Sequence, residues 1–474
     1  MDIKEIAREF GIKLTDERAA ELTMDAETFQ ERLNVFEAAD PDHDPVEGVD
    51  DGDDSYNAFR YRFRAGGGDG ALSGYNVAIK DNIAVAGVPM HCGSREIEYI
   101  PPYHATATAN LLAEGATLLG TTNMDKLAYF TTGETCDFGP TKNPEVTDRV
   151  AGGSSSGSGA AVAGGLVDAA LGSDTGGSVR IPAAFCGIVG FKPTYRSVSR
   201  FGMVDLAPSL DHVGTLARSV ETAARVLESL TGPDVHDPST YATTPPQGIL
   251  EALKEPVSGL HVGLLKEGFD RSSDRVATAV RETAAGLSEF DCSIDEVSAP
   301  GYTGTIDALT TIESCEFATL LSNKGHLYGC GTGYSESWRQ AVSEFVSNGE
   351  YGEHLEESIL INSHLLRTTE GEQYVAAQNA RREFVRTIDG LFEMYDALIT
   401  PTTPMTAPEF GEVASVDDLL YTEANTGPFN LTGHPAISVP GGEVDRLPVG
   451  LQVVADWNAD GTAAKLASAV ETLG

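Results

Sequence analysis

The chain has 474 residues, 41% of them hydrophobic, which is enough for one large globular domain with an appendage and too apolar for a disordered protein. Its 71 acidic residues outnumber 32 basic ones and give a net charge of −39. Binding to nucleic acid or to an anionic membrane needs a basic patch, which the sequence lacks, so neither partner is expected. Because the acid is spread along the chain and only 10 basic residues are lysine, we predict an acidic, halophilic surface that concentrated salt screens.

The cysteines and the N-terminus bear on the compartment. Six cysteines without a Cys-x-x-Cys pair indicate reduced thiols rather than a disulfide framework. The first ten residues lack the apolar segment of a secretory signal, and no apolar run of membrane-spanning length follows. The sequence therefore predicts a soluble, cytoplasmic protein.

The N-terminal region has a helical pattern. Ile3, Ile6 and Phe10 lie at helical spacing, and residues 3–38 are predicted to form short amphipathic helices. Residues 37–57 are acidic and contain Pro and Gly, which predicts a linker. Two or three such helices cannot bury both of their faces alone. They are expected to pack on the main body or on a second copy of the chain.

In the main body, apolar segments of strand length alternate with helical patterns. Strands are predicted over 75–79, 116–120, 187–191, 259–266, 395–400 and 436–439, and helices over 105–114, 220–230 and 274–287 and at the C-terminus. This alternation predicts an α/β fold with a large mixed, mainly parallel central sheet covered by helices on both sides.

The most distinctive stretch runs from Gly152 to Pro182, where two turns of small residues (GGSSSG and GSDTGGS) flank an apolar segment. Glycine lets backbone N–H groups come close to a ligand. Ser154 and Ser178 are the candidate nucleophiles, and a serine hydroxyl needs a base to become reactive. Lys80 ends an apolar strand. A lysine there is commonly a solvated surface residue, but a buried one would be neutral enough to act as that base.

Other chemistries fit less well. Gly153 to Gly157 matches the G-x-S-x-G nucleophile elbow with Ser155 as nucleophile, but no buried strand is predicted directly before it. Neither glycine turn is followed by the Lys-Ser or Lys-Thr of a phosphate-binding loop. The ten histidines show no metal-ligand spacing. We expect no metal and no cofactor.

These residues resemble the amidase signature family, whose likeness covers roughly residues 70–470. The matching pieces are VAIKDN (77–82), GGSSSG (152–157), GSDTGGSVRIP (172–182), GFKPT (190–194) and GHPAISVP (433–440). The resemblance implies a Ser-cisSer-Lys triad, with Ser178 as nucleophile, Ser154 as the bridging serine after a cis peptide bond, and Lys80 as base.

The second glycine turn is expected to stabilise the anion formed during the reaction. Consecutive backbone N–H groups of Thr175, Gly176, Gly177 and Ser178 would form an oxyanion hole. Three further residues are expected to support this loop without taking part in the chemistry, in part by the same resemblance: Asp174, Arg180 and Ser155.

Two activities within the family remain open. The stretch from Lys192 to Asp211 resembles the glutaminase component of the tRNA-dependent amidotransferase. The N-terminal extension and the sequences GVPM (87–90) and ANTGPF (424–429) instead resemble stand-alone bacterial amidases. The Arg and Asp through which the glutaminase component holds glutamine have no convincing match here. We therefore predict a stand-alone amidase that hydrolyses a small carboxamide to carboxylate and ammonia, with the glutaminase component of an amidotransferase as the alternative.

The resemblance also sets the domain organisation. Residues 1–55 are assigned to an N-terminal helical segment with its acidic linker, and residues 56–474 to the catalytic domain. The partners expected are a small amide substrate and, through the N-terminal helices, a second copy of the chain in a homodimer.

Overall fold

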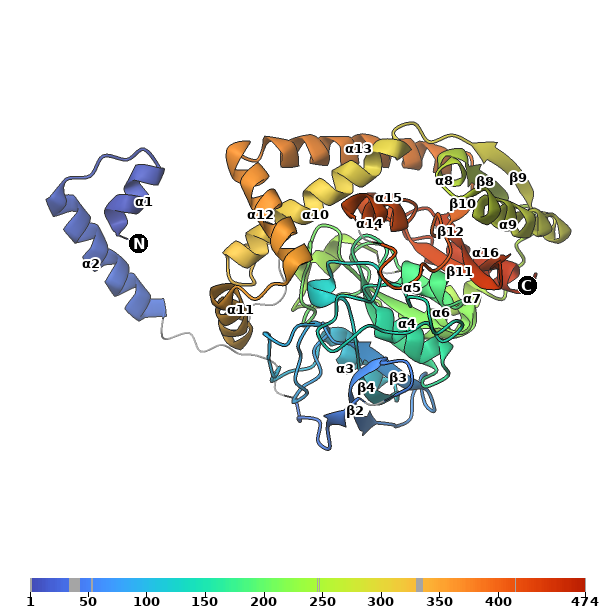
Figure 1. The fold of residues 1–474 in the computed structure, drawn as a ribbon, viewed down its shortest axis with the longest axis horizontal. Helices are drawn as coiled ribbons and strands as arrows, with labels where there is room; N and C mark the ends of the chain where they lie inside the picture. Colours follow the sequence, from blue (N-terminus) through green and yellow to red (C-terminus); the bar gives the residue numbers. More distant parts are fainter. Residues whose placement is uncertain are drawn as a thin grey trace. The chain divides into compact units, whose positions relative to one another are not determined.

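A computed structural model describes residues 2–33, 43–52, 54–244, 246, 248–329, 336–413 and 415–473 (Figure 1). The chain divides into two compact units, Met1–Pro41 and Asp42–Gly474. Residues 34–42, which carry the end of the predicted helical region and the start of the predicted linker, lie outside the described residues.

The N-terminal unit consists of α1 (Ile3–Glu9) and α2 (Asp16–Leu33), as the helical pattern predicts. Asp2 begins α1 with a capping box: its carboxylate accepts from the backbone N–H of Lys4, and its own N–H donates to Glu5 over 3.0 Å. Much of the apolar surface of this unit stays exposed, Phe10 by 74%. The unit therefore buries little core of its own.

The larger unit is built around one sheet of twelve strands. In spatial order the strands are β1 (Asp50–Asp51), β2 (Phe59–Gly66), β4 (Thr117–Thr122), β3 (Asn76–Lys80), β5 (Ala169–Asp174), β7 (His212–Ala217), β6 (Val189–Lys192), β11 (Ala436–Val444), β12 (Leu447–Ala455), β10 (Ala397–Pro401), β8 (His261–Leu265) and β9 (Ser293–Val297).

Helices fill the connections between these strands. They are α3 (Thr106–Ala113), α4 (Ser156–Ala163), α5 (Arg180–Phe185), α6 (Val220–Leu230), α7 (Ile249–Ala252), α8 (Lys266–Asp270), α9 (Asp274–Ala285), α10 (Thr305–Ser322), α11 (Glu336–Asn348), α12 (Glu353–Thr368), α13 (Glu372–Phe392), α14 (Val416–Thr422), α15 (Pro428–Thr432) and α16 (Asp460–Glu471). Short 3₁₀ helices lie at Lys126–Ala128, Pro238–Ala242, Gly286–Phe290 and Tyr302–Gly304.

The prediction of a mainly parallel sheet is wrong. β3 is parallel to β4 and β5, and β8 is parallel to β9 and β10, but the remaining seven pairs in the described sheet are antiparallel. The reason lies in β7, which inserts between β5 and β6 and runs against both. β11 and β12 then form a hairpin that turns at Asp445 and Arg446, both with positive φ.

Alternate side chains of the central strands enter apolar cores on opposite faces of the sheet. On β3, Val77 and Ile79 join a core with residues of α3, α6 and α16, whereas Ala78 joins a second core with Ala161 of α4. Because successive side chains of a strand point to opposite faces, Lys80 lies on the same side as Ala78. The strand thus directs its lysine toward α4.

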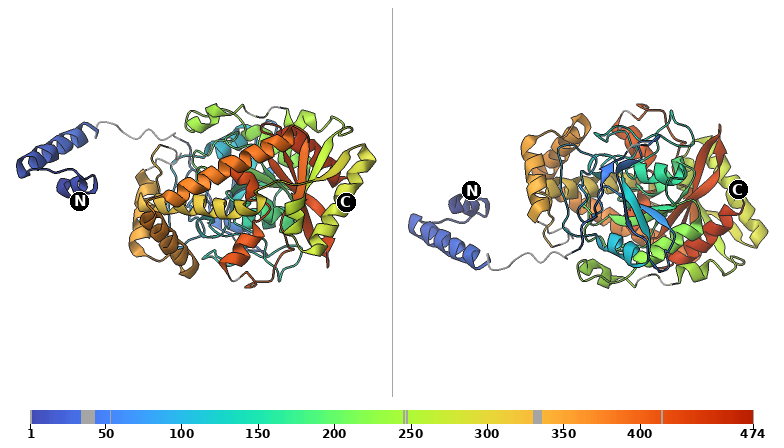
Figure 2. Two further views of the ribbon diagram at one scale, coloured as in Figure 1. Left: turned by 90° about the horizontal axis from the view of Figure 1, so that it is seen from above. Right: turned by 90° about the horizontal axis from the view of Figure 1, so that it is seen from below.

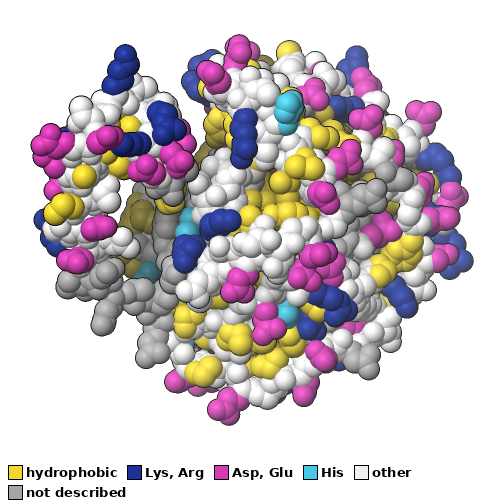
Figure 3. Space-filling view, turned by 60° about the vertical axis from the view of Figure 1, so that its left-hand side comes forward, with side chains coloured by type: hydrophobic (Ala, Val, Ile, Leu, Met, Phe, Trp, Pro, Cys, Tyr) yellow, Lys and Arg dark blue, Asp and Glu magenta, His cyan; other side chains and the backbone are white. Residues whose placement is uncertain are grey.

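Four helices from residues 305–392, a region without a readable sequence pattern, complete the unit. α10 and α13 run side by side, and α12 packs against both of them (Figures 1 and 2). None of the described helices is long and apolar enough to cross a membrane. On the face seen in Figure 3, Asp and Glu side chains are scattered among the others rather than gathered in one patch.

Candidate active site

Lys80 is the last residue of β3, and its side chain is fully buried. Its Nζ donates to the hydroxyl of Ser154 over 2.6 Å and to the hydroxyl of Ser173 over 2.8 Å. Ser154 stands in the loop before α4, a helix that packs against β3. The strand end and the helix start therefore bring together a lysine and a serine that are 74 residues apart in the sequence.

The surroundings of Lys80 favour its neutral form. Burial lowers the pKa of its ammonium from the ordinary 10.5 to about 7, and the nearby carboxyls of Asp125, Asp174 and Asp211 oppose that shift without cancelling it. A lysine in this state is neutral in half of the molecules near neutral pH. It can accept a proton from the serine that it contacts.

Ser178 lies beside the same loop. The peptide bond between Gly153 and Ser154 is cis, and the backbone N–H of Ser155 donates to the carbonyl of Ser178 over 3.2 Å. Within the described part of the chain, the Ser178 hydroxyl has no hydrogen-bond partner. Catalytic hydrogen bonds often form only when substrate is bound. The structure thus brings Lys80, Ser154 and the segment of Ser178 into one place.

The backbone of residues 175–178 is held so that its N–H groups are free. Asn430 donates to the carbonyl of Asp174 over 3.0 Å, and Thr426 donates to the carbonyl of Gly176 over 2.6 Å. In a planar peptide unit the N–H points away from the C=O, so tying these carbonyls to the protein turns the next N–H groups outward. None of the four N–H groups donates to an acceptor in the described residues. They are available to an oxyanion.

Gly177 could not be replaced by a larger residue. Its φ is +142°, a conformation that side chains rarely adopt, and the Thr426 hydroxyl occupies the space that a Cβ would need. The glycine pair seen in the sequence therefore serves a close approach between the loop and the segment after α14.

Asp174 and Arg180 support the loop through a fully buried ion pair. The Arg180 guanidinium donates to both carboxylate oxygens of Asp174 over 3.0 and 2.8 Å. Its other N–H groups reach Asn430, Gln452 and the carbonyl of Thr426. Burial alone would raise the pKa of the Asp174 carboxyl, but the charge and hydrogen bonds of Arg180 hold it well below its usual range. The pair stays ionised and fixes both ends of the turn.

Ser155 does not occupy a nucleophile elbow. Its hydroxyl is fully buried and donates to the carbonyl of Ser173 over 3.2 Å. No strand precedes it among residues 140–151, all of which are described. Ser155 thus holds the two glycine turns together.

Several residues of this region were not found from the sequence. Thr426, Asn430 and Gln452 act at a distance of some 250 residues, and the glycine-rich turn gives no sign of which side chains will bind its carbonyls. Glu313 and Glu423 are also close to the loop. An acidic residue in an acidic chain carries no signal of its own, and only the fold shows that these two are withdrawn from solvent.

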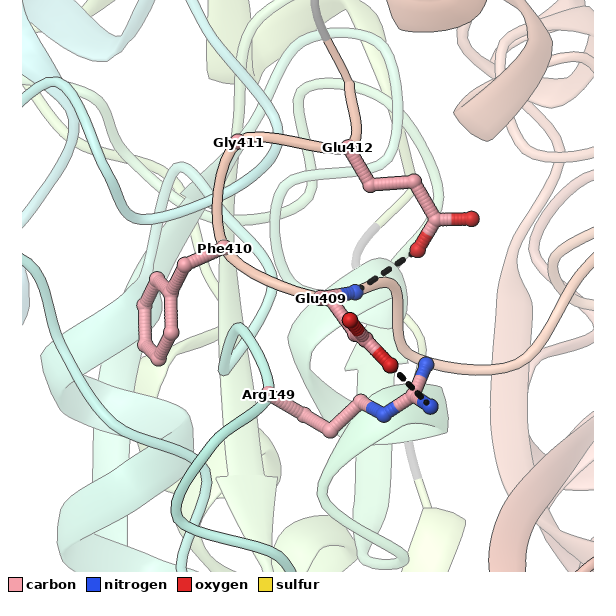
Figure 4. A pocket seen from close by; sticks show the side chains of 5 residues that line it. All are labelled: Arg149, Glu409, Phe410, Gly411 and Glu412. Carbon is pink, nitrogen blue, oxygen red and sulfur yellow. Dashed lines mark hydrogen bonds and ion pairs between the residues drawn. The ribbon is translucent and has the colours of Figure 1, made fainter.

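The surface near this centre has a hollow, lined by Arg149, Glu409, Phe410, Gly411 and Glu412 (Figure 4). Arg149 forms an ion pair with Glu409 over 3.1 Å, and the side chain of Glu412 accepts from the backbone N–H of Glu409. The hollow lies beside the segment that leads into Gly152. It contains no group of the Lys80 centre.

A neutral lysine on a serine, next to a second serine in a turn of free amides, is an arrangement for nucleophilic attack on an acyl group. The comparisons agree with this class of chemistry. The sequence profile of the family described as Amidase matches residues 56–463. The chain belongs to the amidase signature family, hydrolases that act on C–N bonds.

Individual relatives are more specific. The chain is 42% identical to the glutaminase (A-type) component of the glutamyl-tRNA(Gln) amidotransferase of Halobacterium salinarum over 412 residues, which is 86% of this chain and 97% of that protein. The crystal structure of the corresponding component from Thermotoga maritima matches with a TM-score of 0.75 at 32% identity, over 94% of this chain and 90% of that one. The crystal structure of an amidase matches with a TM-score of 0.71 at 30% identity, over 85% of both chains.

Proposed function

We propose that this chain hydrolyses the side-chain amide of glutamine, releasing glutamate and ammonia, as the glutaminase component of an amidotransferase. The hydrogen bond between Lys80 and Ser154, beside the free amides that precede Ser178, supports the hydrolytic part of the proposal. The specific substrate is supported by the relatives, since those at 40–42% identity are the corresponding components of glutamyl-tRNA(Gln) amidotransferases. This favours the alternative over the stand-alone amidase predicted first.

The proposed reaction moves one proton along three side chains. Neutral Lys80 accepts the proton of Ser154, and Ser154 accepts that of Ser178, whose Oγ attacks the amide carbon. The carbonyl oxygen becomes an anion that the N–H groups of residues 175–178 stabilise. The C–N bond breaks, the proton returns through Ser154 to the leaving nitrogen, and ammonia departs. Water then attacks the acyl-enzyme by the same route and releases the carboxylate.

A stand-alone amidase is the second candidate. The family match begins at residue 56, so α1 and α2 lie outside it, and the solved amidase covers as much of this chain as several of the amidotransferase relatives do. Under this proposal the N-terminal helices would join two copies of the chain. Sizing the purified full-length chain in concentrated salt tests that arrangement: a homodimer supports it and a monomer contradicts it.

The two candidates differ in substrate preference. Ammonia release from glutamine is compared with release from acetamide, propionamide and benzamide, using the full chain in concentrated KCl. A strong preference for glutamine supports the glutaminase. Equal or faster hydrolysis of the simple amides reverses the order of the two candidates, and absence of hydrolysis of any amide would contradict both.

A further inference from the structure

The carboxylate of Glu423 lies directly against the turn that carries the free amides. Glu423 follows α14 as its C-cap, and one of its oxygens occupies the space that a Cβ at Gly176 would take. The residue is only 6% exposed. No described residue donates a hydrogen bond or an ion pair to this carboxylate.

A second carboxyl, that of Glu313, approaches from α10. Leu309 of this helix lies 3.4 Å from the Cβ position of Gly176. Residues four apart share one face of a helix, so Glu313 extends along the same face one turn further. Its charge raises the pKa of Glu423, which burial already holds well above its usual range. Glu313 also accepts no hydrogen bond within the described residues.

Neighbouring carboxyls show how unusual this is. Glu316, one turn away on α10, accepts from the backbone N–H of Ser209 over 3.0 Å and from the hydroxyl of Tyr374 over 2.8 Å. Asp211 accepts from the hydroxyl of Thr175 over 2.6 Å and from two backbone N–H groups. Buried carboxyls normally have such donors, because leaving them without any is costly.

The missing donors point to a cation. An ammonium group offers three N–H donors and one positive charge, and is compact enough to lie between two carboxylates. We propose that Glu423 and Glu313 form an ammonium subsite next to the oxyanion turn, so that the preferred substrates are carboxamides that carry an ammonium group. This inference rests on the proposed amide hydrolysis, and glutamine is one member of the class.

The same surroundings disfavour a carboxylate on the substrate. The charges of Asp211 and Glu316 act on Glu313, and that of Asp174 acts on Glu423, in each case with the sign that disfavours another anion. The positive charge of Arg180 is already bound by Asp174. The subsite therefore recognises the ammonium of glutamine and gains nothing from its carboxylate.

Four amides of matched length separate these charges. Glutamine carries both groups, 4-aminobutanamide lacks the carboxylate, glutaramate lacks the ammonium, and butanamide lacks both. Hydrogen bonds to charged groups imply that the ammonium raises kcat/KM roughly 10- to 100-fold, so 4-aminobutanamide should exceed butanamide by that factor. Glutaramate should be the poorest substrate. A ratio of one or less for 4-aminobutanamide over butanamide, or a preference for glutaramate, overturns the proposal.

Charge-neutral variants test the two residues. In Glu423→Gln and Glu313→Gln the ratio of kcat/KM for 4-aminobutanamide to that for butanamide should fall toward one. Asp307→Asn, which removes an exposed carboxylate from the same helix, should keep the ratio of the unaltered chain. Variants of both glutamates that retain the full ratio contradict the assignment.

Binding without turnover separates this inference from the proposed function. In the full-length Ser178→Ala chain, titration calorimetry should give tighter binding of 4-aminobutanamide than of butanamide or glutaramate. If this order is seen but the unaltered chain hydrolyses none of the four amides, the proposed function fails and the ammonium subsite stands. If amides are hydrolysed but this order is absent, the subsite fails and the function stands.

Discussion

The burial of Lys80 predicts how the reaction rate depends on pH. Only neutral Lys80 can accept a proton, and its pKa of about 7 makes the neutral fraction roughly one in eleven at pH 6 and roughly ten in eleven at pH 8. Because the lowered pKa belongs to a base, activity should be lost as the pH falls. We expect kcat/KM to rise about tenfold between these two pH values.

The assay has two independent readouts. Ammonia release gives kcat/KM, and the rate at which a fluorophosphonate acylates Ser178 reports the activated hydroxyl without amide turnover. Both should rise with the same midpoint. In Asp125→Asn the midpoint should move to lower pH, since Asp125 is the first of the charges that raise the pKa of Lys80. Glu409→Gln, which alters an exposed carboxylate, serves as control.

Two results would refute this reasoning. A rate that does not change between about pH 6 and about pH 8 would mean that Lys80 is not the titrating base. A midpoint near 10.5, the ordinary value for lysine, would mean that the side chain is solvated rather than buried.

Three further outcomes are expected. Ser178→Ala should abolish fluorophosphonate labelling and Ser155→Ala should leave most of it, and the reverse would favour the elbow assignment. Thr426→Val should lower kcat by roughly tenfold with little change in KM, because Gly176 loses the hydrogen bond that orients its peptide unit; Thr426→Ser should retain the rate. Asp174→Asn should lower the free energy of unfolding by about 3–5 kcal/mol in denaturant titrations, since the buried Arg180 charge loses its partner, and a change under ~1 kcal/mol would contradict a structural role for that pair.

Local sequence signals predicted the elements of the core well. The helix over 220–230 matches α6 at both ends, and the predicted strands over 75–79 and 395–400 match β3 and β10 to within about a residue or two at each end. Such segments carry strong apolar periodicity or end at Gly and Pro. Strand direction was mispredicted because neighbours in a sheet are set by connections, and β7 returns between two strands without leaving a mark in its own sequence.

The site was predictable only as far as its motifs reach. Lys80, Ser154 and Ser178 lie in short, unusual patterns whose chemistry limits their composition. Thr426 and Glu313 are single polar residues in ordinary surroundings, and their importance comes from the place to which α10 and the segment after α14 bring them. No local pattern encodes a contact of that length.

The bracing of the glycine turn has a consequence for synthesis of the protein. A ribosome would have completed Lys80, Ser154 and Ser178 long before Thr426 and Gln452, which lie 246 and 272 residues beyond Arg180. A nascent chain of half length would carry every reacting group but lack the side chains that aim its amides. Competence to cleave amides would arrive with the last stretch of translation, so unfinished chains would leave the amides around them intact.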